Sequence, residues 1–372
     1  MGPHPSHEAG STPPDACEII SVGKRRDGGT RFWCLRHHAD ATAKYGVSAS
    51  QCRYAHIPLI KESEIHTIRV SDYAGGVGLW GAVPPVYDTT TAPLDRGIHV
   101  HARRDPRGPK VIDATYRAVR VEFEGEAHLV TDLDAIYFMV SRIFEQPLRE
   151  VRCTRCQHSH LDRDWFAVHP HRRHLCAGCG HHFRGDAAAV GNPIGALQRA
   201  FPSRSRAPSK AKPLSLRQAD YPGGIQIWGS NRAFLWTSPV QEATGVHIHA
   251  FAAVHDAEPV IDETYSEVEI DGIKLVAAQV GVLMAQRSMP HLNGRVANVS
   301  CSLCAAPEFA TDRAAYELTV QRTCRSCGEE FSARGVLRKV VSNPAVECLA
   351  RLANYAPGAP RVHDIGLIPE TL

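Results

Sequence analysis

The chain has 372 residues and a formal net charge of +3, a length that predicts two or three domains. Hydrophobic residues make up 43% and charged residues 22% of the sequence, which excludes a largely disordered chain, a collagen-like repeat and a coiled coil. The longest apolar stretch, residues 273–285, is shorter than the ~20 residues of a membrane-spanning helix, so no membrane association is expected. The N-terminus has no basic or apolar signal region, and we expect a cytoplasmic protein.

The N-terminal part is predicted to be a disordered tail at 1–16 and a small Cys/His zinc module at 17–69. The candidate zinc ligands of this module are three cysteines and one histidine: Cys17, Cys34, His37 and Cys52. A reducing compartment gives little use for disulfides, and a Cys₃His set can close a structural zinc site. The spacings are irregular, so free buried thiols stay open as the alternative, as does the choice between His37 and His38.

The next segment is predicted to be the first of two copies of an α+β unit, at 70–197. Alternation of apolar and polar residues predicts strands at 97–102 and 118–123. A helix is predicted over 132–144, and another after Pro193, because proline suits the first helical turn. Each unit is therefore expected to be a small α+β domain that ends in a cysteine-rich module and a helix.

A pair of histidines on the predicted strand 97–102 is the sharpest candidate for catalytic chemistry. His99 and His101 are two residues apart, so both side chains point to one face of the strand, about 7 Å apart. Two such imidazoles can bind one metal ion, and Asp113 downstream would add a carboxylate. The same residue types recur in the second copy: His247, His249 and Asp262. The alternative is that the histidines lie on the solvent face of a half-buried strand.

Eight of the twelve cysteines form four Cys-x-x-Cys pairs: Cys153/Cys156, Cys176/Cys179, Cys301/Cys304 and Cys324/Cys327. In both sets 19 residues separate the two pairs, and a glycine follows the last cysteine. The modules 153–183 and 301–331 resemble the zinc-ribbon family, and the resemblance implies one structural zinc ion held by four cysteines in each. Redox pairs or disulfides do not explain two pairs at a repeated spacing. With the N-terminal module, two to three zinc ions are expected.

The two cysteine modules differ in charge. Residues 152–184 contain six arginines, two aspartates and seven histidines, whereas residues 300–334 contain four arginines, five acidic residues and no histidine. The segment 198–219 is a predicted linker with six basic residues and no acidic ones. Arginines beside aromatic side chains can neutralise phosphates and stack on bases. The predicted nucleic-acid contacts are Arg155, Arg163, Trp165, Arg172 and Arg173. The alternative is a solvated hairpin whose histidines add zinc ligands.

The second copy is predicted at 220–352, followed by a tail at 353–372. Residues 72–81 match 220–229, and the Gly-x-His-x-His-Ala segment at 97–102 recurs 148 residues later. Self-similarity at a fixed offset indicates an internal repeat. The predicted fold class is therefore α+β: a tandem duplicated α+β unit, each copy ending in a zinc ribbon, preceded by the small N-terminal Cys/His module.

Three functions fit these features, and we favour the first. It is a zinc protein that binds DNA or RNA through the first ribbon and the linker. The second is a metal-dependent hydrolase or oxygenase that uses a His-x-His/Asp site, with an open coordination position for water or an oxidant. The third is a zinc-stabilised scaffold for protein partners. The chain has no phosphate-binding loop, no His-Glu-x-x-His and no Gly-x-Ser-x-Gly, so an enzyme would use an unfamiliar type of site.

Overall fold

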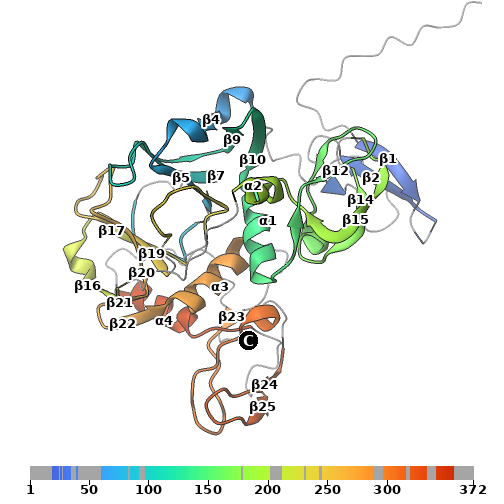
Figure 1. Ribbon diagram of the computed structural model, residues 1–372. Coiled ribbons are helices and arrows are strands. Elements are labelled where there is room, and N and C mark those ends of the chain that lie inside the picture. Colours follow the sequence, from blue (N-terminus) through green and yellow to red (C-terminus); the bar gives the residue numbers. More distant parts are fainter. Residues whose placement is uncertain are drawn as a thin grey trace, which may run out of the picture.

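The fold is mixed α+β and consists mostly of strands (Figure 1). The computed structural model describes residues 19–24, 26, 28–34, 39–40, 60–82, 84–91, 97–176, 179–201, 212–229, 232–242, 245–288, 296–315, 319–332 and 341–355. No helix in these ranges is long and apolar enough to cross a membrane.

The N-terminal module contributes a small antiparallel sheet. Its strands are β1 (Ile19–Lys24), β2 (Thr30–Cys34) and β3 (Ala39–Asp40). Cys34, at the end of β2, is fully buried. The other predicted ligands of this module, Cys17, His37 and Cys52, lie outside the described residues, so the predicted zinc site stays a prediction.

The first half of the remaining chain builds two sheets from strands that are distant in sequence. One sheet has the order β10-β9-β4, with β4 parallel to β9. The other contains β5, β7 and β8. Their bounds are β4 (Ile65–Arg69), β5 (Gly76–Ala82), β7 (Gly97–Arg103), β8 (Ile112–Tyr116), β9 (Ala118–Phe123) and β10 (Glu126–Thr131). The predicted strands at 97–102 and 118–123 are therefore present.

The second half presents corresponding elements in the same order. The strand β16 is parallel to β21, which pairs with β22, and β17, β19 and β20 form a second sheet. Their bounds are β16 (Leu214–Leu216), β17 (Gly224–Gly229), β19 (Val246–Phe251), β20 (Ile261–Tyr265), β21 (Glu267–Ile270) and β22 (Ile273–Val276). Because β4 and β16 pair inside these sheets, each half begins before the predicted boundaries at 70 and 220.

The two halves exchange short strands. β6 (Tyr87–Asp88), from the first half, pairs with β17 of the second half. β18 (Leu235–Trp236), from the second half, pairs with β5 of the first half. Each four-stranded sheet thus ends in a strand that the other half supplies, so the halves are not independent domains.

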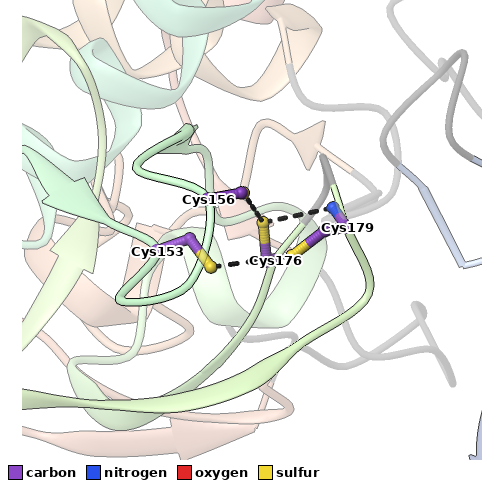
Figure 2. A group of neighbouring side chains, drawn as sticks. All are labelled: Cys153, Cys156, Cys176 and Cys179. Atoms are coloured by element: carbon purple, nitrogen blue, oxygen red, sulfur yellow. Dashed lines mark hydrogen bonds between the residues drawn. The ribbon is translucent and has the colours of Figure 1, made fainter.

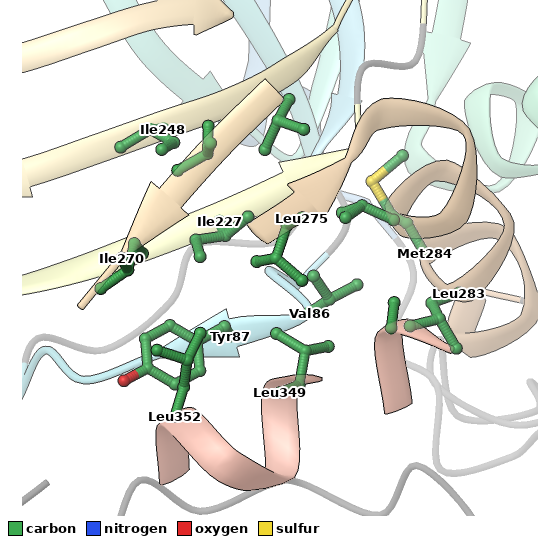
Figure 3. Close-up of a cluster of buried hydrophobic side chains, with 14 of the residues drawn as sticks. Val86, Tyr87, Ile227, Ile248, Ile270, Leu275, Leu283, Met284, Leu349 and Leu352 are labelled. Atoms are coloured by element: carbon green, nitrogen blue, oxygen red, sulfur yellow. The ribbon is translucent and has the colours of Figure 1, made fainter. Parts of the chain in front are cut away.

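The hydrophobic cores follow the same exchange. Val86 and Tyr87 are 4% and 3% exposed and lie in the core of the second half, beside Leu349 and Leu352 (Figure 3). Phe234 and Leu235 are equally buried in the core of the first half. Burial of such side chains stabilises by about 1.5–3 kcal/mol each, so the exchanged strands bind the halves together.

A repeated glycine makes room for each exchanged segment. Gly76 has φ +103°, and a Cβ there would lie 2.2 Å from the Cα of Ser238. Gly224 has φ +104°, and a Cβ there would lie 2.7 Å from the backbone nitrogen of Thr90. Any larger residue would be strained and would push the other half's chain away, which accounts for the second glycine of the Gly-Gly pair in both matching segments.

Two helices cover the sheets and contact each other. α1 (Asp132–Ile143) packs on β5, and α3 (Ala277–Ser288) packs on β17. The predicted helix at 132–144 is confirmed to within one residue. Thr131 caps α1, and its backbone N–H donates to the Asp134 carboxylate at 2.8 Å, which forms a capping box.

The repeated Asn-Pro pairs begin the last helix of each half, as the sequence predicted. These helices are α2 (Ile194–Ala200) and α4 (Ala345–Tyr355). The Asn192 side chain accepts a hydrogen bond from the Ile194 N–H at 3.0 Å and donates to the Asp134 carbonyl at 2.9 Å. Asn343 does the same for α4 and α3. Each asparagine thus caps one helix and fastens it to the longer helix.

The two cysteine modules are built from short strands after α1 and after α3. Those of the first are β11 (Leu148–Arg149), β12 (Val151–Arg152), β13 (Ser159–His160), β14 (His171–Leu175) and β15 (His182–Gly191). Those of the second are β23 (Val296–Ala297), β24 (Gln321–Thr323), β25 (Glu330–Ser332) and β26 (Val341–Ser342). In both modules the second cysteine pair lies on an antiparallel hairpin, β14–β15 or β24–β25.

Candidate metal centres

The first cysteine module brings its four thiols together (Figure 2). Cys153 Sγ lies 3.7 Å from Cys179 Sγ, and Cys156 Sγ lies 3.4 Å from Cys176 Sγ. Four sulfurs at about 2.3 Å from one zinc ion in a tetrahedron are about 3.8 Å apart. Burial raises the pKa of Cys153, but the N–H groups of Cys156 and Arg155 lower it to about 7. This group could hold a zinc ion.

The second module has the same arrangement. Cys301 Sγ lies 3.8 Å from Cys327 Sγ, and Cys304 Sγ lies 3.6 Å from Cys324 Sγ. Backbone N–H groups, chiefly that of Cys327, lower the pKa of the Cys324 thiol to about 7, which favours the thiolate that binds metal. This group could also hold zinc, so two Cys₄ sites support zinc binding.

The histidine pair of the first half meets its predicted carboxylate. His99 and His101 lie on β7, and Asp113 lies on the neighbouring β8, directly opposite His101. His99 Nε2 is 2.8 Å from His101 Nε2. Asp113 Oδ1 is 3.4 Å from the first of these nitrogens and 3.2 Å from the second. All three side chains are partly exposed, so solvent reaches the group.

The second half repeats this geometry on β19 and β20. His247 Nε2 is 3.1 Å from His249 Nε2, and Asp262 Oδ1 lies 3.4 and 3.3 Å from these two nitrogens. Asp262 Oδ1 is buried and has no aligned hydrogen bond. In each half the strand register, not the chain spacing, brings the carboxylate to the histidines.

The charge states of His99, His247 and Asp262 suit metal binding. Burial and the adjacent His101 lower the pKa of His99 to about 3, and burial and His249 lower that of His247 to about 3. Burial raises the pKa of Asp262, but His249 and Lys110 lower it well below its usual range. Neutral imidazole and ionised carboxylate are the forms that bind a divalent cation.

Each first histidine is also oriented by a hydroxyl group. His99 Nδ1 lies 3.1 Å from Thr115 Oγ1, and His247 Nδ1 lies 3.1 Å from Thr264 Oγ1. A partner on Nδ1 fixes the ring and directs Nε2 at the centre of the group. Both threonines belong to the repeated Val-Ile-Asp-x-Thr-Tyr segment, so the sequence held a signal for them that the prediction did not use.

A single lysine joins the two groups, and sequence reasoning missed it. Lys110 Nζ lies 2.5 Å from Asp113 Oδ2 and also contacts Asp262 Oδ2. Each aspartate thus directs one oxygen at its histidines and the other at a shared ammonium. We refer to the six ligand side chains around Lys110 as the paired centre. No repeated pattern points to Lys110, because Pro259 stands at the matching place in the second half.

Tryptophans of the repeated segments pack against the histidines. The ring centroids of Trp80 and His101 are 4.9 Å apart, and those of Trp228 and His249 are 4.7 Å apart. Trp80 also contacts Trp236 of the exchanged strand β18, at 5.6 Å. The strand exchange therefore supports the paired centre directly.

The residues predicted to contact nucleic acid divide into two groups. Arg155, Arg172 and Arg173 are exposed. Arg163 is half-buried, and its charge acts to lower the pKa of the Asp134 carboxyl, which burial raises. Trp165 lies in the short helix η3 (Asp164–Ala167), and its side chain lies outside the described structure. Residues 202–211 of the basic linker lie outside the described ranges.

Comparison with known proteins does not assign the chain to a family. No protein-family model matches it, and neither the curated proteins nor the solved structures contain a significant match. Function must therefore be argued from the sites themselves.

Proposed function

We propose that this protein is a metal-dependent hydrolase whose reaction takes place at the paired centre, with zinc at the two Cys₄ sites stabilising the fold. The observation that carries the proposal is the convergence of two His₂Asp groups on one lysine at the junction of the two halves. A structural site is closed by four protein ligands, whereas a catalytic site keeps an open position. Three ligands per group correspond to the second kind.

The donor separations support metal binding over simple hydrogen bonding. Ligands at about 2.1 Å from one ion are about 3.0 Å apart in octahedral geometry and about 3.4 Å apart in tetrahedral geometry. The separations in the two groups run from 2.8 to 3.4 Å. Two Nε2 lone pairs at 2.8 Å repel each other unless a proton or a cation lies between them, and one ion in each group would satisfy that group's pair of nitrogens.

The open coordination positions favour hydrolysis. A bound divalent ion lowers the pKa of its water to about 7 and so supplies a hydroxide nucleophile at neutral pH. Lys110 would hold both aspartates in place and compensate part of their charge. A single His₂-carboxylate group with open positions is also the ligand set of non-haem iron oxygenases. The experiment must therefore distinguish a hydrolase from an oxygenase.

The test is metal content and turnover in the same preparation. We expect His99→Ala/His101→Ala to lose one metal ion relative to the parent and to abolish hydrolysis of a panel of phosphoester, carboxylic ester and amide substrates. Arg172→Ala/Arg173→Ala is the matched control and should retain both the ion and the activity. Unchanged metal content in the histidine variant would contradict the proposal. Substrate-dependent oxygen consumption by the Fe(II)-loaded protein, without hydrolysis, would replace the hydrolase by an oxygenase.

Nucleic-acid binding is a second candidate, favoured by the adjacent exposed side chains of Arg172 and Arg173 on β14. Phosphate contacts lose affinity steeply with salt, with a slope of about −0.7 per contact for single strands. Arg172→Ala/Arg173→Ala should weaken binding to a single-stranded oligonucleotide and reduce that slope by about 1–1.5. Here His99→Ala/His101→Ala is the control. No binding at ~50 mM salt would end this candidate and leave a protein-binding scaffold as the remaining role for the first ribbon.

We also infer that the two halves arose by tandem duplication. The same order of elements in both halves and the symmetric exchange of β6 and β18 support this origin. In this proposal the unit is one intertwined pair spanning 60–201 and 212–355. The N-terminal zinc site, a protein partner and a cytoplasmic location are also proposals.

A further inference from the structure

Three histidines and one aspartate converge inside the first ribbon, away from its cysteines. Asp162 Oδ1 lies 2.6 Å from His160 Nε2, 3.2 Å from His171 Nε2 and 3.4 Å from His174 Nδ1. His160, Asp162 and His174 are 3%, 4% and 2% exposed. Charged and polar side chains this deeply buried need partners that compensate their desolvation.

The local fold holds the carboxylate in one orientation. His160 ends β13, His171 and His174 come from β14, and Gly191 ends β15. The Gly191 N–H donates to Asp162 Oδ2 at 2.5 Å, and the Asp162 N–H donates to the Gly191 carbonyl at 2.8 Å. Asp162 Oδ1 is thereby directed at the three imidazoles.

Hydrogen bonds alone do not satisfy this group. One carboxylate oxygen has two lone pairs, yet three ring nitrogens surround it. The far nitrogens, His160 Nδ1 and His174 Nε2, are buried without a hydrogen-bond partner, so hydrogen bonds leave these rings unsatisfied. The ring nitrogens that face Asp162 Oδ1 would instead supply lone pairs to a metal ion. His160, Asp162 and His174 bring one donor atom each within 4.8 Å of one another. With His171, which faces the same oxygen, they would supply the four ligands of a closed tetrahedral zinc site.

The second ribbon shows what fills this space without such ligands. Glu308 and Arg322 stand at the positions of His160 and His174, and Ala310 stands at that of Asp162. The backbone is the same, because the Ala310 N–H donates to the Ser342 carbonyl at 2.8 Å. Glu308 and Arg322 are 6% and 9% exposed. Burial lowers the pKa of Arg322, and the charge of Glu308 offsets part of that effect. In the second ribbon, a glutamate and an arginine of opposite charge occupy the corresponding positions.

We propose that His160, Asp162, His171 and His174 form a structural zinc site, so that the first ribbon binds two zinc ions and the second ribbon binds one. Phe183 separates this site from the Cys₄ site: it packs with Cys153 and Cys176, and its ring lies 5.4 Å from that of His174. The site accounts for three of the seven histidines that distinguish the two ribbons. It does not depend on the proposed hydrolase.

The test is zinc content per chain, measured by mass spectrometry of the full-length protein. His160→Ala/His174→Ala should lose one zinc ion relative to the parent. Glu308→Gln is the matched control in the second ribbon and should lose none. Equal zinc content in the histidine variant and the parent would overturn the proposal.

Because these histidines are buried, the variant could also release the Cys₄ zinc by unfolding the ribbon. The zinc-edge anomalous difference map of crystals of the unmodified protein therefore gives a second readout, in which the two Cys₄ peaks serve as internal standards. A peak about 2.0–2.2 Å from His160 Nε2 and Asp162 Oδ1 is expected. Cys₄ peaks without one here would refute the site. A peak here with none at the paired centre would refute only the proposed catalytic metals.

Discussion

Truncation of Leu235 should destabilise the half of the molecule to which it does not belong in sequence. Leu235 lies on β18 in the second half, but it is 1% exposed and packs in the core of the first half, opposite Leu79 of β5. We therefore expect Leu235→Ala to loosen β5 and β7 of the first half first.

The magnitude follows from the groups removed. Leu235→Ala deletes three buried carbon atoms, worth about 2.4 kcal/mol at ~0.8 kcal/mol each. A residual cavity of ~60 Å³ would add about 1.5 kcal/mol at ~24 cal/mol per Å³. The expected loss in the free energy of unfolding is therefore about 3–4 kcal/mol.

The assays are urea denaturation of the zinc-loaded protein and amide hydrogen exchange of the folded state. Amide protection should fall in β5 and β7. Val240 lies in the segment that follows β18 and is 52% exposed. Val240→Ala is therefore the matched control and should change the free energy of unfolding by less than about 0.5 kcal/mol. A loss below about 1 kcal/mol, or a loss of protection confined to β17 and β19, would show that β18 does not belong to the first core.

Further predictions concern the glycine contact, the shared lysine and the cysteines. Gly76→Ala should lower the free energy of unfolding by more than ~2 kcal/mol in thermal melts, because φ is +103° and its Cβ would overlap Ser238. Gly125→Ala is the control: φ is +80° but the space around it is open, so the loss should be only about 1 kcal/mol. Lys110→Met should lower the melting temperature of the metal-free protein, because two close carboxylates lose the ammonium group between them. Adding Zn²⁺ should then raise the melting temperature of this variant by more than it raises that of the parent. An equal rise in both would show that the metal binds elsewhere. Cys153→Ser should remove one zinc ion per chain by mass spectrometry, and unchanged zinc content would exclude the Cys₄ ligand set.

Features that depend only on neighbouring residues could be predicted from the sequence. A strand repeats its side-chain direction every two residues, so His99 and His101 could be placed on one face from the sequence. The capped helix at 132–143 carries its own signals, from Thr131 to the amphipathic run that follows. Asp113 was a harder prediction, because its position depends on the register between β7 and β8.

Other features lay beyond any local pattern. The unit boundaries at 70 and 220 missed β4 and β16, because both are short strands that show their role only by pairing with β9 and β21. Arg163 is half-buried, and its charge acts on the Asp134 carboxyl, a neighbour that the sequence pattern did not indicate; its contact with nucleic acid stays a prediction. Nothing in a run of arginines and histidines distinguishes those that face water from those that gather around a buried Asp162.

The two Cys₄ groups and the two His-x-His pairs could be predicted from the sequence, because a repeated Cys-x-x-Cys spacing and the two-residue period of a strand are local patterns. The exchange of strands between the halves and the meeting of the two His₂Asp groups at one lysine are visible only in the folded chain. Lys110 and Asp262 are 152 residues apart in the chain, and only the packing of one half on the other brings them into contact. Contacts at that separation depend on the whole fold, so no local pattern in the sequence encodes them.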